Sequence, residues 1–212
     1  MLEEQFFRIL FSRMNNIEEI EPQVTIAADM VIAAVTSGGR FVVYDENGQM
    51  SGESSYRCSG LRLPVHGATS DMELIYVTAK DVVIIYSLLP ATEKSLAALD
   101  KARVAGCYII AVCPKTRGEK IPPGRTLAEY ADIHIDDLSD AEGVIRPEGW
   151  KKSIAPTTAI MNDIILWYLH GTIIDRMLMR GMVPGVLRGG HIKGGNNWNK
   201  TVVDSLYKVR GW

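Results

Sequence analysis

The chain has 212 residues, of which 47% are hydrophobic and 23% are charged, and its formal net charge is −2. A chain of this length and composition folds around a well-buried core, so we expect a single domain over residues 1–212. The sequence contains no block of lysine and arginine, which excludes nucleic acid as the expected partner and leaves a small molecule or a protein.

Cysteine content and the N-terminal segment bear on the compartment of the protein. Cys58, Cys107 and Cys113 are an odd number and lack the spacing of a zinc site or a disulfide framework. The segment Met1–Met14 mixes acidic, basic and apolar side chains, unlike a signal peptide, and no apolar stretch reaches membrane-spanning length. We therefore expect a cytoplasmic protein that holds no metal or cofactor and contacts no membrane.

Helical and strand patterns alternate from the N-terminus onward. Apolar residues at helical spacing predict a first helix over residues 2–14, as a helical extension that ends by about residue 20. A second helix is predicted over Val24–Thr36, where the following serine and two glycines end it. Phe41–Tyr44 has the composition of a buried strand, and a polar loop is expected over Asp45–Ser55.

The rest of the chain continues this alternation. The remaining strands are expected at Leu61–Val65, Val82–Tyr86, Tyr108–Val112 and Ile133–Ile135, and the remaining helices at Thr92–Ala105, Ala155–Met182 and Asn197–Val209. A C-terminal tail from about residue 185 begins with a glycine-rich surface loop, Gly185–Gly195. Apolar strands separated by helices predict a three-layer α/β/α sandwich with a parallel sheet. In such a sheet, ligands bind in the loops that leave the strand ends, here Asp45–Ser55 and Ser87–Glu93.

Four segments, taken in order, carry a family resemblance. The first runs from Ala27 through Gly38-Gly39-Arg40-Phe41 to Tyr44 and resumes at residues 56–61; the second covers 80–87 and 106–112; the third covers 123–136; the last comprises 155–158, 180–181, 194–195 and Asn199. Together they resemble the sugar isomerase (SIS) phosphosugar-binding domains, and most closely a subgroup related to the phosphoheptose isomerases. The resemblance covers about residues 20–209.

The resemblance implies a five-stranded parallel sheet of the flavodoxin-like, doubly wound type. It also implies a sugar phosphate as ligand, at a site that a neighbouring subunit completes, and hence a homodimer or homotetramer. Hydroxyl groups and backbone N–H groups at helix N-termini suit such an anion.

The chain departs from the family pattern in the loop after the first strand. The family carries Gly-x-Gly-x-Ser there, whereas this chain has Asp45-Glu46-Asn47-Gly48-Gln49-Met50-Ser51. The two acids would repel a phosphate. Asn47, Gly48 and Ser51 are the candidate ligand residues, and capping of a helix explains Ser51 equally well.

The loop after Val82–Tyr86 departs as well. The family carries Ser-x-Ser-Gly, and here Ser87 is followed by Leu88, Leu89 and Pro90, so that one serine, one glycine and one backbone donor are missing. Ser87, at the end of a buried strand, is favoured as a ligand donor, and Thr92 is a further candidate.

Candidates for acid–base chemistry are few. Phosphoheptose isomerases carry Gln-Glu-x-His on the long helix, where this chain has Asn162-Asp163-Ile164-Ile165, without the histidine. His170 lies on a different face of that helix and cannot replace it. Asp163 and Glu53 remain as candidate catalytic residues. Glu53 precedes the helix-like segment Ser54–Ser59, and is either the base of an aldose–ketose isomerisation or an acid favoured by the helix dipole.

Two further groups complete the candidate ligand residues. Thr157 and Thr158 open the long helix, where they either bind an anion or cap the helix. His191 and Asn199 flank Gly194-Gly195, in a polar tail that is either a solvated loop or reaches a ligand site or a second subunit.

The sequence therefore predicts a phosphosugar-binding protein with a degenerate phosphate loop. An active aldose–ketose isomerase is the alternative, and a non-catalytic structural or regulatory dimer is a third. The acids Asp45 and Glu46, with Asp136, Asp137 and Asp140, could in principle hold a divalent cation, but their spacing matches no metal motif.

Overall fold

The computed structural model describes residues 1–56, 60–115, 124–140 and 143–212, with the side chains of residues 55 and 56 left out. Two parts of the family resemblance therefore lie outside the described residues. They are residues 57–59 of the segment 56–61, which include Cys58, and Pro123 of the segment 123–136. None of the described helices combines the length and the apolar composition that crossing a bilayer requires.

Five short strands form one parallel sheet, as the sequence predicts, although one edge strand lies at Val65–Ala68 rather than at Leu61–Val65. Its strands are β1 (Phe41–Asp45), β3 (Val65–Ala68), β4 (Val82–Tyr86), β5 (Tyr108–Cys113) and β6 (Ile133–Asp136), in the spatial order β3-β1-β4-β5-β6. Every pairing in this sheet is parallel. This is the flavodoxin-like strand order, in which the chain winds outward in both directions from the first strand.

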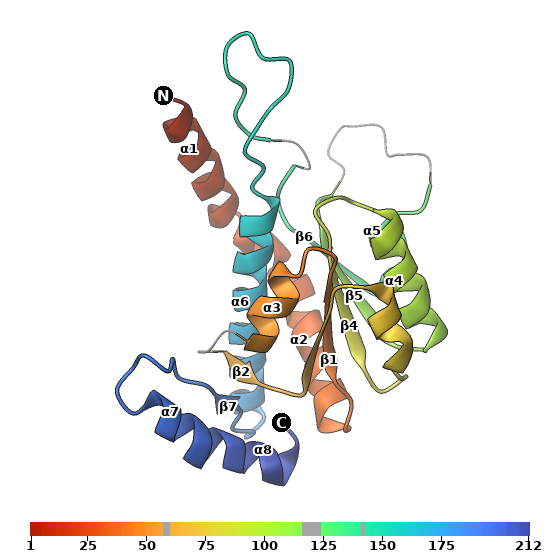
Figure 1. Cartoon of the computed structure of the whole chain (residues 1–212), viewed down its shortest axis with the longest axis vertical. Helices are drawn as coiled ribbons and strands as arrows, with labels where there is room; N and C mark the ends of the chain where they lie inside the picture. The colour runs from red at the N-terminus through yellow and green to blue at the C-terminus, as the bar shows by residue number, and fades with distance from the viewer. Residues whose placement is uncertain (57–59, 116–123, 141–142) are drawn as a thin grey trace.

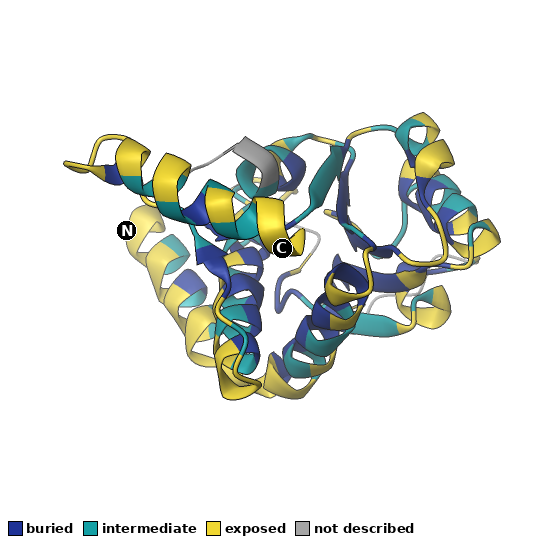
Figure 2. Ribbon diagram, turned by 90° about the horizontal axis from the view of Figure 1, so that it is seen from below, coloured by how far each residue is buried: buried dark blue, intermediate teal, exposed yellow. Residues whose placement is uncertain are grey.

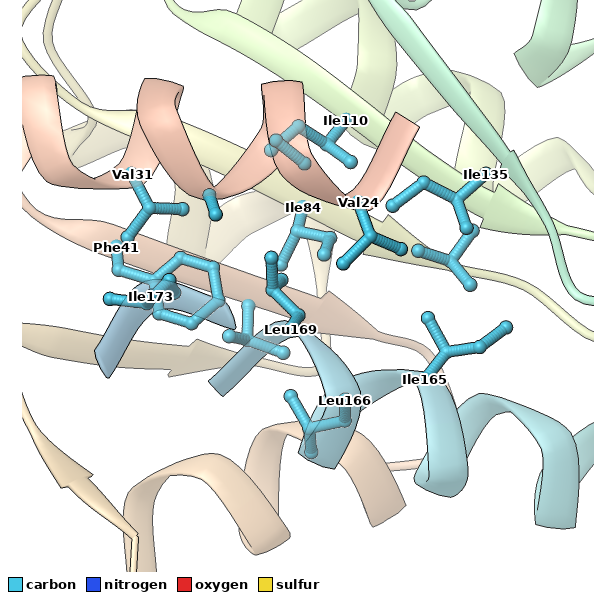
Figure 3. Packing of buried hydrophobic residues seen from close by; sticks show 14 of the residues in the cluster. Val24, Val31, Phe41, Ile84, Ile110, Ile135, Ile165, Leu166, Leu169 and Ile173 are labelled. Carbon is cyan, nitrogen blue, oxygen red and sulfur yellow. The ribbon is translucent and has the colours of Figure 1, made fainter. Parts of the chain in front are cut away.

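Helices cover both faces of the sheet (Figure 1). On one face lie α2 (Glu21–Thr36) and α6 (Thr158–Met179), and on the other η2 (Asp71–Tyr76), α4 (Glu93–Val104) and α5 (Leu127–Tyr130). Alternate strand residues point to opposite faces, so Phe41 and Val43 pack with α2 and α6, while Val42 and Tyr44 pack in the other layer. Figure 3 shows Val24 and Val31 of α2 facing Leu169 and Ile173 of α6 over the sheet.

The two ends of the chain extend this three-layer body. At the N-terminus, α1 (Leu2–Asn15) leads through the 3-10 turn η1 (Ile17–Ile20) into α2. At the C-terminus lie β7 (Gly185–Val186), α7 (Gly195–Trp198), the π-helical turn η3 (Asn199–Val203) and α8 (Asp204–Arg210). Figure 2 shows that the helices turn their buried sides toward the sheet and their exposed sides outward.

Two sequence predictions were wrong in detail. The expected loop over Asp45–Ser55 begins with the last residue of β1 and contains a helix, α3 (Gln49–Tyr56). The expected strand Leu61–Val65 is divided, since β2 (Leu61–Arg62) pairs antiparallel with β7 in a separate small sheet, whereas Val65 begins β3. The glycine-rich segment Gly185–Gly195 consequently begins with a strand rather than with a loop.

Candidate functional site

The carboxyl ends of β1 and β4 lie side by side. These strands pair in parallel, with Tyr44 opposite Ile85 and Asp45 opposite Tyr86. From this pair the chain continues outward in opposite directions, to β3 beyond β1 and to β5 beyond β4. In doubly wound sheets such a reversal of strand order opens a crevice at the carboxyl edge, where ligands bind. The sequence prediction that these two strand ends share one edge is confirmed.

A hollow of about 90 Å³ lies at this edge, and we refer to it as the hollow. It is bounded by the turn between β1 and α3, by the loop after β4 and by the first turns of α6. Its lining residues are Asp45, Asn47, Gln49, Met50, Leu88, Ala159 and Asn162. Pockets for whole small molecules are typically about 300–1,000 Å³, so the hollow as it stands has room for only one end of such a molecule.

Asp45 accepts hydrogen bonds from the turn that forms one wall of the hollow. Its buried carboxylate accepts the backbone N–H of Asn47 at 3.0 Å and that of Met50 at 2.8 Å, while its carbonyl oxygen accepts the N–H of Gly48 at 3.0 Å. The carboxylate thus caps α3 at its N-terminus, where a negative charge is stabilised. Ser51 is buried and donates to the carbonyl oxygen of Gly48 at 3.3 Å.

The next helix, α4, has one of its N-terminal donors, the N–H of Ser95, capped by Thr92. Thr92 and Ser95 form a reciprocal capping box, in which each backbone N–H reaches the other residue's hydroxyl at 2.9–3.0 Å. The Thr92 hydroxyl also donates to the Glu46 carboxylate at 3.4 Å. Ser87 is buried, donates its N–H to the carbonyl oxygen of Val112 at 3.0 Å, and accepts the N–H of Leu89 at 3.4 Å. The Thr92 hydroxyl is therefore engaged within the chain, whereas the Ser87 hydroxyl is an acceptor in the described part of the chain and its own O–H remains a candidate donor.

Two buried polar atoms, one on the wall of the hollow and one on the residue that pairs with Asp45, have no hydrogen-bond partner in the described part of the chain. They are Oδ1 of Asn162, which lines the hollow, and the hydroxyl of Tyr86 at the end of β4. Burial raises the pKa of Tyr86, and the charges of Asp163 and Asp45 raise it further, so its hydroxyl stays neutral. Buried polar atoms normally have partners, so these two are candidates for contact with a ligand or with water.

The candidate catalytic residues lie on two different helices, α6 and α3. Asp163 follows Asn162 on α6, and its charge acts on Tyr86. Glu53 lies half-buried on α3 and is not among the residues that line the hollow. His170 packs against the rings of Phe41, at the opposite end of β1, and Trp167, with ring centroids 6.3 and 5.6 Å away. Burial lowers the pKa of His170 to about 4, and its position excludes a direct role in the hollow.

Thr157 and Thr158 at the start of α6 are fully buried and already bonded. Arg13 of α1 donates to the Thr157 hydroxyl and, at 2.6 Å, to the carboxylate of Asp140. The Thr158 hydroxyl accepts from Ser139 at 2.9 Å. Sequence reasoning missed Arg13, because nothing in the spacing of α1 connects it with a segment 144 residues away.

His191 and Asn199 lie in the tail that follows α6, and Figure 1 shows this tail at the end of the molecule where α6 finishes. The Asn199 side chain makes two hydrogen bonds with the backbone of Arg188. Its Oδ1 accepts the Arg188 N–H and its Nδ2 donates to the Arg188 carbonyl oxygen, both at 2.8 Å. His191 is exposed. Within one chain neither residue reaches the hollow, because the hollow lies at the N-terminal end of α6 and the tail follows its C-terminal end.

The described residues contain no group of three or more histidine, cysteine or acidic side chains placed to hold a metal ion. The cysteines among them, Cys107 and Cys113, are both buried and form no disulfide. Burial raises the pKa of Cys107 to about 11, so its thiol is an unreactive part of the core.

Comparison with known proteins places the chain in a family. The family model described as "Domain of unknown function (DUF2529)" matches residues 5–177. A UPF0309 protein of Streptomyces griseus is 26% identical over 94% of this chain and 92% of its own length. A UPF0309 protein of Brucella anthropi is 23% identical over 94% of each chain.

Solved structures share the fold at low sequence identity. A phosphoheptose isomerase from Francisella tularensis has a TM-score of 0.55 and 14% identity, over 81% of this chain and 95% of that one. A phosphoheptose isomerase from Neisseria gonorrhoeae has a TM-score of 0.53 and 13% identity, over 82% and 98%. The sugar isomerase domain of an RpiR transcription factor from Sphaerobacter thermophilus has a TM-score of 0.50 and 16% identity, over 82% and 92%. The chain belongs to the DUF2529 family and has the sugar isomerase (SIS) fold.

Proposed function

We propose that this protein binds a sugar-derived metabolite in the hollow between the ends of β1 and β4. The observation that carries the proposal is the buried, unpartnered Oδ1 of Asn162 on the wall of the hollow, at the edge where doubly wound sheets bind ligands. Two solved structures of this fold are titled phosphoheptose isomerases, which supports a sugar as the class of ligand.

We further propose that binding, rather than turnover, is the main activity. Isomerisation needs a base that moves a proton between neighbouring carbons. The histidine of the family motif is replaced by Ile165, and His170 packs at the opposite end of the sheet. The alternative, an active isomerase, is favoured by one electrostatic effect: the charge of Asp163 raises the pKa of the buried Tyr86 hydroxyl.

Thermal unfolding in the presence of sugars and their phosphates tests the binding proposal, since a ligand that binds only the folded state must stabilise it. We expect at least one member of a panel of trioses to heptoses to raise the Tm. The rise should disappear in Asn162→Ala and persist in Asn15→Ala, whose side chain lies exposed at the end of α1. If no member raises the Tm of the unmodified protein, the binding proposal is wrong.

Incubation of aldose and ketose phosphates in deuterated water, followed by NMR, separates binding from turnover. The binding proposal predicts no exchange at the second carbon. Exchange that Asp163→Asn abolishes, and that Asp175→Asn on the exposed side of the same helix leaves intact, would instead establish the isomerase.

A further inference from the structure

We propose that the hollow accepts an uncharged hydroxyl-bearing or a cationic amine-bearing end of the ligand and rejects a phosphate group. This inference rests on the proposed function and concerns the chemistry of the ligand at the same site. It is argued from three features of the hollow: the occupation of its backbone donors, the sign of its charges and the kind of atom it leaves unpartnered.

The backbone donors that the turn between β1 and α3 would offer to a phosphate are occupied by Asp45. Phosphate sites at helix N-termini offer backbone N–H groups that point at the anion. In the turn between β1 and α3, the N–H groups of Asn47 and Met50 both bond to the Asp45 carboxylate, and that of Gly48 bonds to the Asp45 carbonyl oxygen. The carboxylate of Asp45 therefore occupies the position that an anion would take.

The charges around the hollow oppose a second anion. Asp45 lines it, Glu46 reaches the N-terminus of α4, and Asp163 acts on the Tyr86 hydroxyl. The described residues that line the hollow include no lysine, arginine or histidine. Like charges at close range repel where water is partly excluded, so a phosphate group would be disfavoured.

The nearest guanidinium described at the start of α6 offers no compensation. Arg13 approaches this helix, but it donates to the Thr157 hydroxyl and forms an ion pair with Asp140 at 2.6 Å. Only 11% of its side chain is exposed, so its charge is committed to these two partners.

The unpartnered atom on the wall is an acceptor. Oδ1 of Asn162 lacks a donor, and a buried acceptor left unsatisfied is destabilising. A sugar hydroxyl or an ammonium group supplies such a donor, whereas an ionised phosphate ester supplies only acceptors. The carboxylates nearby would add an attraction for an ammonium group, which selects an amino sugar over its parent sugar.

Isothermal titration with matched triplets tests the inference. Each triplet consists of a sugar, its amino derivative and its phosphate ester, for example glucose, glucosamine and glucose 6-phosphate, with pentose and heptose sets beside it. In the triplet that binds, we expect the amino sugar to bind at least ~10-fold more tightly than the phosphate ester, and inorganic phosphate not to compete. Asp163→Asn and Glu46→Gln should reduce this preference, whereas the exposed Asp175→Asn should leave it unchanged.

The variant Asp45→Ala provides a second, independent measurement. Removing the carboxylate frees the N–H groups of Asn47 and Met50, so inorganic phosphate should bind this variant at least ~10-fold more tightly than the unmodified protein. A folded Asp45→Ala protein that gains no affinity for phosphate contradicts the inference. If the variant does not fold, the triplets measured on the unmodified protein decide.

The outcomes separate the two proposals. A phosphate ester that binds more tightly than its parent sugar, and that inorganic phosphate displaces, overturns the inference and leaves the proposed function intact. Absence of binding by every member of every triplet overturns the proposed function, and the inference with it.

Discussion

Asp81 and Arg40 join the beginnings of β4 and β1. The Asp81 carboxylate accepts Nη2 of Arg40 at 2.8 Å, its Nε at 3.2 Å and its backbone N–H at 2.7 Å. It also accepts the backbone N–H and the hydroxyl of Thr78, at 2.8 and 3.2 Å. This buried carboxylate therefore fixes the two central strands relative to each other at the edge opposite the hollow.

Replacing Asp81 should be strongly destabilising. Desolvation raises the pKa of Asp81, but the hydrogen bonds from Arg40 and Thr78 outweigh it and hold the pKa below its usual value. Asp81→Ala leaves these donors without an acceptor, and we expect a loss of about 3–5 kcal/mol in the free energy of unfolding. Urea denaturation at pH 7 measures it.

The pH dependence gives this prediction a second readout. Because the folded-state pKa of Asp81 is depressed, the stability it contributes is present above its unfolded pKa and is lost as the pH falls below it. The exposed pair of Asp100 and Arg125 is the control, since Asp100→Asn should cost less than about 1 kcal/mol. Equal losses in the two variants would contradict the assigned role of Asp81.

Gly39 lies where the chain enters β1, and its backbone touches that of Lys80. A Cβ atom at this position would lie 1.9 Å from the Lys80 carbonyl oxygen, so Gly39→Ala forces the entrances of β1 and β4 apart. We expect Gly39→Ala to lower the Tm far more than Gly38→Ala. Gly38 has a φ of +81° but open space around it, so its substitution should cost only about 1–2 kcal/mol. A smaller effect at Gly39 than at Gly38 would refute the close contact.

The sheet was predictable because its strands are buried on both faces. Val82–Tyr86 is an uninterrupted apolar run, and the structure begins and ends β4 at those two residues. The edge strand β3 was not predicted, since its sequence Val-His-Gly-Ala is half-buried and lacks that signal. The helix α3 was taken for a loop because Gly52 and three serines weaken its intrinsic preference, and its cap is supplied by Asp45 at the end of a strand.

The shared edge of β1 and β4 was predictable, but the state of the groups at that edge was not. The parallel pairing of β1 with β4 follows from the alternation of strands and helices, and it sets Asp45 beside Tyr86. No sequence pattern shows that the Asp45 carboxylate bonds to Met50, or that Arg13 reaches Thr157. These contacts depend on side-chain directions that arise only when distant segments pack.

The first helix presents an apolar surface to solvent that we expect a second copy of the chain to cover. Phe7 and Phe11 are 52% and 56% exposed and stack with their ring centroids 6.2 Å apart. Burying two such aromatic rings on each subunit would favour a dimer by several kcal/mol, at about 1.5–3 kcal/mol for each side chain.

The double variant Phe7→Ser, Phe11→Ser should therefore be monomeric at concentrations where the unmodified chain is dimeric. Light scattering coupled to size-exclusion chromatography measures this directly. Val209→Ser, which removes an apolar side chain that is 84% exposed on α8, is the control and should leave the mass unchanged. If the double variant keeps the mass of the unmodified protein, the interface does not include Phe7 and Phe11.

Asp137 should make the stability of the protein fall as the pH rises from about 4 to about 7. Its carboxyl is fully buried after β6, and burial raises its pKa to about 7. Oδ1 accepts the N–H of Ser139 at 2.8 Å, whereas Oδ2 has no partner in the described part of the chain. Above its pKa the folded protein must bury an anion that the unfolded chain leaves in water, so the folded state binds more protons between these pH values.

The variant Asp137→Asn keeps the acceptor for Ser139 and removes the charge. At pH 8 it should be more stable than the unmodified protein by a few kcal/mol, since one pH unit of displacement in a pKa corresponds to about 1.4 kcal/mol. At pH 4, where the buried carboxyl is protonated, the two proteins should differ little. Urea denaturation at pH 4, 6 and 8 measures the difference, with the exposed Asp175→Asn as control. A difference that stays constant across this range would show that the carboxyl is ionised throughout and that its charge is balanced within the fold.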